Sequence, residues 1–222
     1  MKTFDIQKEF FSDIIAGNNM NDKNKYIYNE LILFRFLEVI KSTFPIYCDY
    51  IKDDILQKQI KEFIIYGSNT SYVWKISFEF KDFLFEHKNI SKTQKEILIF
   101  EIKQIQIYAS CIDIKSKNLS YKRKYKLSKN AYIQKHNFDI INQTYKKIKT
   151  KYYLIYKDIN DYDVYYLELS KFLYLFFKYQ RANNTINKAI KLASKQSNLN
   201  YYDAKNISKN AIENFINTAI LI

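Results

Sequence analysis

Between residues 152 and 177 the apolar residues change from two short strand-like runs to a helical run, and this stretch gives the clearest structural prediction in the chain. Two short runs rich in aromatic and β-branched residues, 152–156 and 164–167, flank a turn segment rich in Asp and Asn. Asp and Asn tolerate turn conformations, so the pattern predicts a β-hairpin. Ser170 follows in position to cap a helix that begins at Lys171.

Two more amphipathic segments follow this helix. Thr185 can cap a helix over 185–195, and a last helix is expected over 203–218 with Ile207, Ile212 and Phe215 facing inward. A hairpin followed by three short helices is the element order of a winged-helix module, which binds nucleic acid or a peptide. The order favours a binding protein over an enzyme.

The first half of the chain keeps helical spacing throughout. We expect helices over these ranges: 4–16, 25–43, 53–66, 77–86, and from Ser91 to about residue 108. Phe44-Pro45 should end the second helix because Pro cannot continue its hydrogen-bond ladder. Trp74 is expected to fill the core. Four or five helices around one core would form a helical bundle.

Between the halves the pattern is weak. Residues 121–127 alternate as a strand could, and residues 138–148 could form a short helix. We interpret residues 111–150 as a basic connector that could add a strand to the final module. The expected organisation is a bundle domain (1–110), this connector, and a winged-helix-like domain (151–222), in an α+β, mostly helical chain.

Composition narrows the fold and partner classes. The 222 residues include only two Gly and one Pro, which disfavours Gly-rich phosphate loops and β-barrels. Residues 111–222 hold 21 Lys or Arg and 8 Asp or Glu, so they carry the whole net charge of +13. Such an excess suggests an acidic partner, either a phosphate backbone or an acidic peptide. A Lys-rich composition would produce the same excess without any partner.

Candidate catalytic groups are scarce. His87 and His136 stand far apart in Lys-rich surroundings without metal-ligand spacing, and we expect both at the surface. Cys48 and Cys111 are expected to be buried or half-buried thiols. We therefore expect no catalytic site, no bound metal and no cofactor. Without a secretory signal, a membrane-length apolar run or a disulfide framework, the expected location is the cytoplasm.

The ordered motifs resemble a family known as HvfC- or BufC-type proteins, first described as DNA-binding domain proteins. The matching residues of the first half are Phe10-Phe11, Ile14-Ile15, Tyr28, Leu37, Ile40, Phe44-Pro45, Phe63-Ile64, Ser71, Glu79-Phe80, Phe83-Leu84 and Glu101. Those of the second half are 154–158, 164–170, Thr185-Ile186 and Ala189. Two positions depart from the family: Lys157 replaces its usual Arg, and residues 88–91 lack its Pro and aromatic residues.

The resemblance implies a non-catalytic partner of a multinuclear non-heme iron-dependent oxidative enzyme (MNIO), forming a heterodimer with this barrel enzyme. Such pairs modify cysteines in ribosomally made peptides (RiPPs). The winged-helix-like domain would act as a RiPP recognition element that takes the leader of a Cys-containing precursor as an added strand. The residues expected to bind the leader are Val164, Tyr165, Tyr166, Leu167, Lys205 and Lys209.

Three alternatives remain open at this level. The strand residues could simply close a small core. The chain could be a DNA-binding transcriptional regulator, although its last two helices offer lysines and no Arg for guanine. It could also be a scaffold whose bundle docks an enzyme without any peptide role. We rank nucleic acid as the second choice of partner and expect no membrane association.

Overall fold

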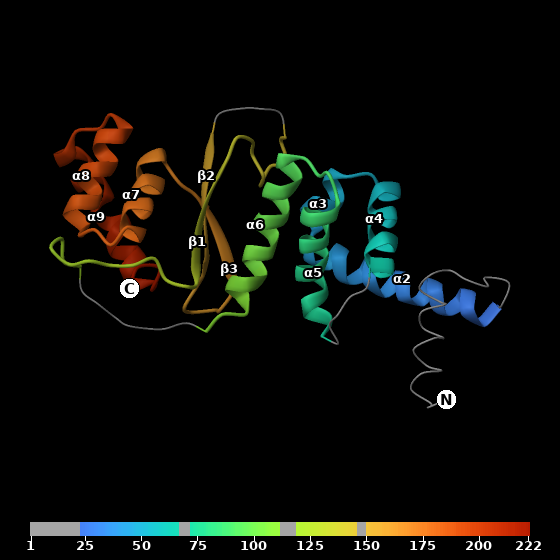
Figure 1. Cartoon of the computed structure of the whole chain (residues 1–222). Coiled ribbons are helices and arrows are strands. Elements are labelled where there is room, and N and C mark those ends of the chain that lie inside the picture. The colour runs from blue at the N-terminus through green and yellow to red at the C-terminus, as the bar shows by residue number, and fades with distance from the viewer. Residues whose placement is uncertain (1–22, 67–71, 112–118, 146–149) are drawn as a thin grey trace. The chain divides into compact units, whose positions relative to one another are not determined.

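The computed structural model describes residues 23–66, 72–111, 119–145 and 150–222, excluding the side chains of residues 23–25 (Figure 1). By its internal contacts the chain divides into two units, Met1–Ile102 and Lys103–Ile222, which are described separately. The described residues form eight helices and one three-stranded antiparallel sheet. The expected α+β, mostly helical class is confirmed.

The first unit is helical over its described residues. Its elements are α2 (Lys23–Thr43), α3 (Pro45–Tyr50), α4 (Asp53–Tyr66), α5 (Val73–His87) and the first part of α6 (Lys92–Tyr108). Helices α3, α4 and α5 pack against α2. The core is aromatic, with the ring of Phe63 centred 5.5 Å from both Phe80 and Phe83. Such ring pairs stabilise a core beyond the area that they bury.

The helix ends of this unit follow local chemistry. Helix α2 ends at Thr43 as predicted, but Pro45 also opens α3, because Pro lacks an N–H that the first turn would leave unpaired. Ser91 caps α6 through two reciprocal hydrogen bonds. The Ser91 hydroxyl accepts from the Gln94 backbone N–H, and the Gln94 side chain accepts from the Ser91 backbone N–H. The helix predicted over 4–16 lies outside the described residues.

The prediction for Trp74 was wrong. Helix α5 begins at Val73, four residues before the predicted start, and Trp74 is 61% exposed. Its ring lies beside those of Tyr72 and Phe78, and the Lys75 ammonium lies over both Trp74 and Tyr72. Residues on another face of α5, among them Ile76 and Phe80, fill the core instead.

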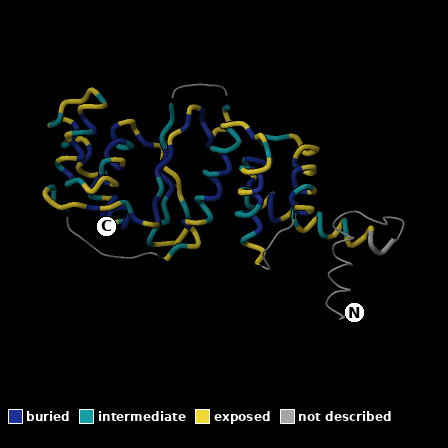
Figure 2. Tube along the Cα trace, viewed as in Figure 1, coloured by how far each residue is buried: buried dark blue, intermediate teal, exposed yellow. Residues whose placement is uncertain are grey.

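The second unit combines the sheet with three helices. Its elements are β1 (Ala131–His136), β2 (Lys151–Lys157), β3 (Val164–Glu168), α7 (Lys171–Arg181), α8 (Ile186–Ser197) and α9 (Tyr201–Asn217). The strand order is β1-β2-β3, so β2 is central. Helix α7 packs on β2 and α8, and α9 packs on α8. One apolar cluster joins these helices to one face of the sheet, as the dark-blue segments of Figure 2 indicate.

The predicted hairpin and helix caps of this unit are confirmed. Strands β2 and β3 contain both predicted runs, and the hydroxyls of Ser170 and Thr185 accept from the backbone N–H groups of Leu173 and Lys188. Helix α9 starts two residues before its predicted start because the Asn200 side chain caps it. Ile207 was wrongly predicted to face inward: it is 80% exposed, and Ala204 and Ser208 are buried instead.

Strand β1 lies within residues 111–150, for which a basic connector was predicted. Residues 121–127 form only single bridges to Thr185 and Leu221, so no strand forms there. The helix suggested over 138–148 is absent from its described part, where Asp139 and Thr144 bridge across a turn. The unit's sheet therefore has a third strand that the hairpin alone did not reveal.

The side chain of Gln180 in α7 is a polar group in the apolar core of this unit, and replacing it tests the stability of that core. It is fully buried, and neither amide atom has a hydrogen-bond partner within the described part of the chain. A buried polar group without a partner costs about 1–3 kcal/mol. We expect Gln180→Met, of similar length and shape, to raise the free energy of unfolding by about 1 kcal/mol or more in urea titrations. A lower value for Gln180→Met than for the wild type would contradict this expectation.

Candidate functional site

The outer edge of β3 is the most accessible backbone edge of the sheet. Strand β1, at the opposite edge, is buried at most positions, whereas residues 165–168 of β3 are all exposed (Figure 2). No strand of the described residues pairs with β3 on its outer side. An edge of this kind is a ready template for another strand.

The register with β2 shows which backbone groups point outward. Leu169 N–H donates to the Tyr152 carbonyl, and Asp158 N–H donates to the Asp163 carbonyl, so both pairs are hydrogen-bonded. In an antiparallel pair such pairs alternate with open ones. The N–H and C=O groups of Val164 and Tyr166 therefore face away from β2. These two residues offer the hydrogen bonds that an added strand would need.

Side chains of β3 alternate between two faces of the sheet. Tyr165 and Leu167 lie opposite Tyr156 and Leu154, on the face that carries α7. Val164 and Tyr166 lie on the other face, opposite Lys157 and Ile155. Tyr165, Tyr166 and Leu167 are 43–49% exposed. An added strand would find apolar and aromatic surface on both sides of the edge.

A turn of acidic residues fixes the start of β3. The Tyr165 hydroxyl donates to the Asp161 carboxylate over 2.6 Å, and this hydrogen bond raises the pKa of Tyr165 to about 12. The Asp158 and Asp161 carboxylates also accept from the backbone N–H groups of Asn160 and Asp163. The predicted role of these acids in forming the turn is thus confirmed.

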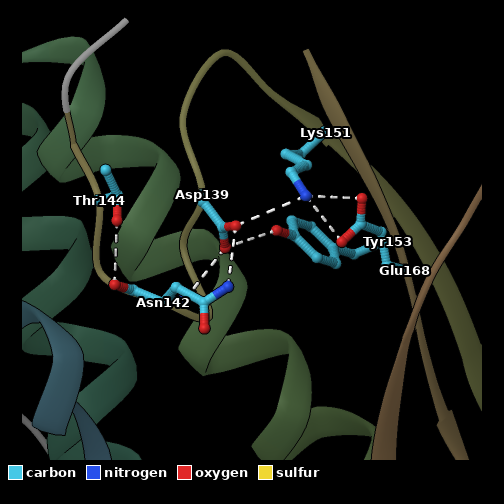
Figure 3. A network of polar contacts seen from close by, with 6 residues as sticks. All are labelled: Asp139, Asn142, Thr144, Lys151, Tyr153 and Glu168. Atoms are coloured by element: carbon cyan, nitrogen blue, oxygen red, sulfur yellow. Dashed lines mark hydrogen bonds and ion pairs between the residues drawn. The ribbon is translucent and has the colours of Figure 1, made fainter. Parts of the chain in front are cut away.

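A polar network fixes the other end of β3 (Figure 3). Lys151 of β2 donates to both carboxylate oxygens of Glu168, at 2.7 and 2.8 Å, and lies 3.5 Å from Asp139. Asp139 also accepts from the Tyr153 hydroxyl and from the backbone and side chain of Asn142. Burial alone would raise the pKa of Asp139, but these hydrogen bonds and the Lys151 charge outweigh it and lower the pKa to about 2.

Lys157 ties the hairpin to the preceding segment of the same unit. Its ammonium donates to the carbonyl of Tyr108 over 2.6 Å and to that of Ser110 over 3.1 Å. The last carbonyls of a helix lack partners within the helix, and cations stabilise them. Lys157 also lies over the rings of Tyr108 and Tyr162. Lys157 therefore serves a structural role in this unit.

The predicted site residues fall into two groups. Val164, Tyr165, Tyr166 and Leu167 lie together on β3. Lys205 and Lys209 lie on α9, which packs on α8, and Figure 1 shows α9 apart from β3. Lys205 is half-buried with its ammonium 4.5 Å from the centre of the Tyr121 ring, and Lys209 is exposed.

The expected locations of His136 and Cys111 were wrong, whereas His87 is exposed as expected. His136 is buried, beside the rings of Phe138 and Tyr153, because β1 carries it into the sheet. Cys111 is exposed, while Cys48 is half-buried as expected. Burial and the nearby Glu101 charge raise the pKa of Cys48 to about 12, which makes its thiol a weak nucleophile. Within the described residues, no three His, Cys, Asp or Glu side chains gather as a metal site requires.

Neither a family model nor a curated protein matches this sequence. Among the helices that the structure describes, none combines the length and apolar character needed to cross a bilayer.

A buried carboxylate in the first unit gives a pH-dependent test of the fold. Glu101 of α6 accepts from the backbone N–H groups of Ile46 and Tyr47, at 2.6 and 3.1 Å, and so caps the start of α3. Burial raises the pKa of Glu101 to about 8, although both N–H donors favour its charged form. A carboxyl whose pKa rises on folding stabilises the protein below its unfolded pKa, and this stabilisation is lost as pH rises through the folded value.

We therefore expect the stability difference between the wild type and Glu101→Gln to depend on pH from about 4.5 to about 8. Over this window the wild type should lose stability relative to the variant by up to about 1.4 kcal/mol per pH unit. Urea titrations of both proteins at several pH values measure the difference. Parallel pH profiles for the two proteins would show that Glu101 is not responsible.

Proposed function

We propose that this chain is a non-catalytic peptide-binding partner of a multinuclear non-heme iron-dependent oxidative enzyme in RiPP maturation. The second unit is a winged-helix-like recognition element, and the first unit is a helical bundle. The leader of a Cys-containing precursor adds to β3 as a fourth strand. The enzyme, bound as the other half of a heterodimer, acts on the cysteines that the leader brings to it.

The exposed outer edge of β3 is the observation that carries this proposal. Its outward backbone groups at Val164 and Tyr166 supply hydrogen bonds, and Tyr165, Tyr166 and Leu167 supply contact surface. Both ends of the strand are fixed, by the Asp161 turn and by the Lys151–Glu168 pair. A preorganised edge adds no ordering cost of its own when a peptide binds.

Charge around the edge defines the peptide that suits it. Asp161 and Asp163 precede β3 and Glu168 ends it, so acids lie at both ends of the strand. Like charges placed opposite each other destabilise strand pairing. The paired segment of the leader is therefore neutral or basic. Acidic residues of a leader would have to lie beyond the strand, because Lys205 and Lys209 lie apart from it on α9.

The first unit offers a surface for the enzyme. Tyr72 and Trp74 are both about 60% exposed at the start of α5, with Lys75 beside them. Trp and Tyr are enriched among the residues that dominate binding energy in protein interfaces. This aromatic group supports a role for the bundle in docking, separate from the peptide edge of the second unit.

A proline at an outward position of β3 tests the peptide edge. Tyr166→Pro removes an outward N–H without removing a donor to β2, and edge strands tolerate such a residue. We expect the affinity for the precursor peptide to fall at least about tenfold, through one lost hydrogen bond and a disturbed strand. Fluorescence anisotropy with labelled precursor measures the affinity, and circular dichroism checks the fold.

Tyr166→Thr is the matched control, because it removes the ring but keeps the N–H. If Tyr166→Pro folds and binds the precursor as the wild type does, strand addition at β3 is refuted. Co-expression with a neighbouring barrel enzyme and precursor peptide tests the partnership itself. Co-elution of all three, with the peptide retained only when this chain is present, is the expected result. Elution of this chain alone, combined with a salt-sensitive shift of duplex DNA, would favour the alternative, a DNA-binding transcriptional regulator.

A further inference from the structure

Residues 121–129 form an extended segment, here called the basic strap, that crosses the helices of the second unit (yellow-green in Figure 1). Its five basic residues are Lys122, Arg123, Lys124, Lys126 and Lys129, and all are exposed. Its apolar residues point the other way: Tyr125 is fully buried in the helical core, and Leu127 packs against it. The sequence alone had assigned these charges to a connector.

Backbone hydrogen bonds fix the strap to the helices at both ends. The carbonyls of Tyr121 and Arg123 accept from the first N–H groups of α8, at Asn187 and Ile186. Further along, Lys126 exchanges two hydrogen bonds with Ile222, and Ser128 N–H donates to the Ile220 carbonyl. The five cations are therefore held on ordered backbone and not on a loose tail.

Among the residues that the structure describes, none of the five strap cations takes part in an ion pair. Helix α9 extends the same surface, because Lys205 lies over the ring of Tyr121 and Lys209 follows one turn later. Glu213 of α9 lies near the start of the strap, where burial and its negative charge raise the pKa of Tyr121.

The exposed side of α9 carries amide side chains. Asn206 and Asn210 are one turn apart, both exposed, and neither makes a side-chain hydrogen bond to a described residue. Asn side chains can pair with the edge of adenine in the major groove, while Lys and Arg neutralise phosphates. A helix face beside a phosphate-binding segment is the arrangement used by helix-based DNA readers.

We propose that the basic strap and the exposed face of α9 form a binding surface for duplex DNA, a function separate from the peptide edge of β3. The strap cations contact phosphates, and α9 lies toward the groove. The strap itself suits a phosphate backbone better than a protein, because it turns its apolar residues inward. The exposed face of α9 does carry two large side chains, Tyr202 and Ile207, which are 73% and 80% exposed. A phosphate backbone needs only fixed, unpaired cations.

The test uses the full chain and a short fluorescein-labelled duplex, with affinity measured by anisotropy over a series of salt concentrations. The triple variant Lys122→Ser, Arg123→Ser, Lys124→Ser should weaken binding at least about tenfold at low salt. It should also reduce the slope of log K against log salt by about 2–3, since each phosphate contact contributes about 0.9. The substituted side chains make no core contact, so the unfolding midpoint should be unchanged.

The matched control is Lys52→Ser, Lys58→Ser, Lys61→Ser, which removes the same charge from exposed positions near and on α4 of the first unit. Wild-type affinity in this control, together with the loss in the strap variant, supports the proposal. Equal losses in both variants would show attraction by net charge alone and overturn it. Tighter binding of a labelled acidic peptide than of the duplex would also overturn it, in favour of an acidic protein partner.

Discussion

The antiparallel pairing of β2 with both of its neighbours is the interaction on which the second unit depends. Tyr153, Leu154 and Ile155 of β2 are each fully buried, so both faces of this strand are covered. Leu154 faces the helical core, whereas Tyr153 donates its hydroxyl to Asp139 on the other face. A strand in this position cannot accept a further partner. Growth of the sheet is therefore confined to its edges, of which β3 is the exposed one.

The network around Lys151 explains why that edge is ordered. Lys151 is the first residue of β2 and Glu168 the last of β3, so their ion pair joins the strands where they end. A pair on the surface is screened by water and contributes little by itself. Asp139 adds to it from the residues that follow β1, and so the three strands meet in one polar group. At the opposite end, Asp161 and Tyr165 hold the turn.

Local chemistry made the hairpin and most helix ends predictable from sequence. Ser91, Ser170 and Thr185 each accept the capping hydrogen bond that their positions suggested. The four β3 positions of the candidate site were equally readable, because aromatic residues next to an Asp-rich turn mark an exposed strand of a hairpin. These features depend on residues close together in the chain, and one sequence contains all the information about them.

Features that depend on distant residues were not predictable in this way. His136 is buried because β1 pairs with β2, a partner fifteen or more residues away. Ile207 looked apolar enough to face inward, but Ala204, Ser208 and Ile212 take that side of α9, where α8 is packed. Residues 121–127 alternate in sequence and bury Tyr125, but their backbone partners are α8 and Ile222, far away in the chain, and one sequence does not identify them.

That attachment changes how the charge of the chain should be interpreted. Four acids of the second unit lie at the ends of β3, in the turn with Asp158, Asp161 and Asp163 and at Glu168. The strap holds five cations on the helical side, and none of them forms an ion pair with a described residue. A Lys-rich composition alone would place excess lysines around β3 as well as on the strap. Since opposite charges attract different partners and like charges repel, the segregation favours a neutral or basic peptide at β3 and a polyanion at the strap. The two surfaces belong to different elements, so occupation of one leaves the backbone groups of the other unchanged.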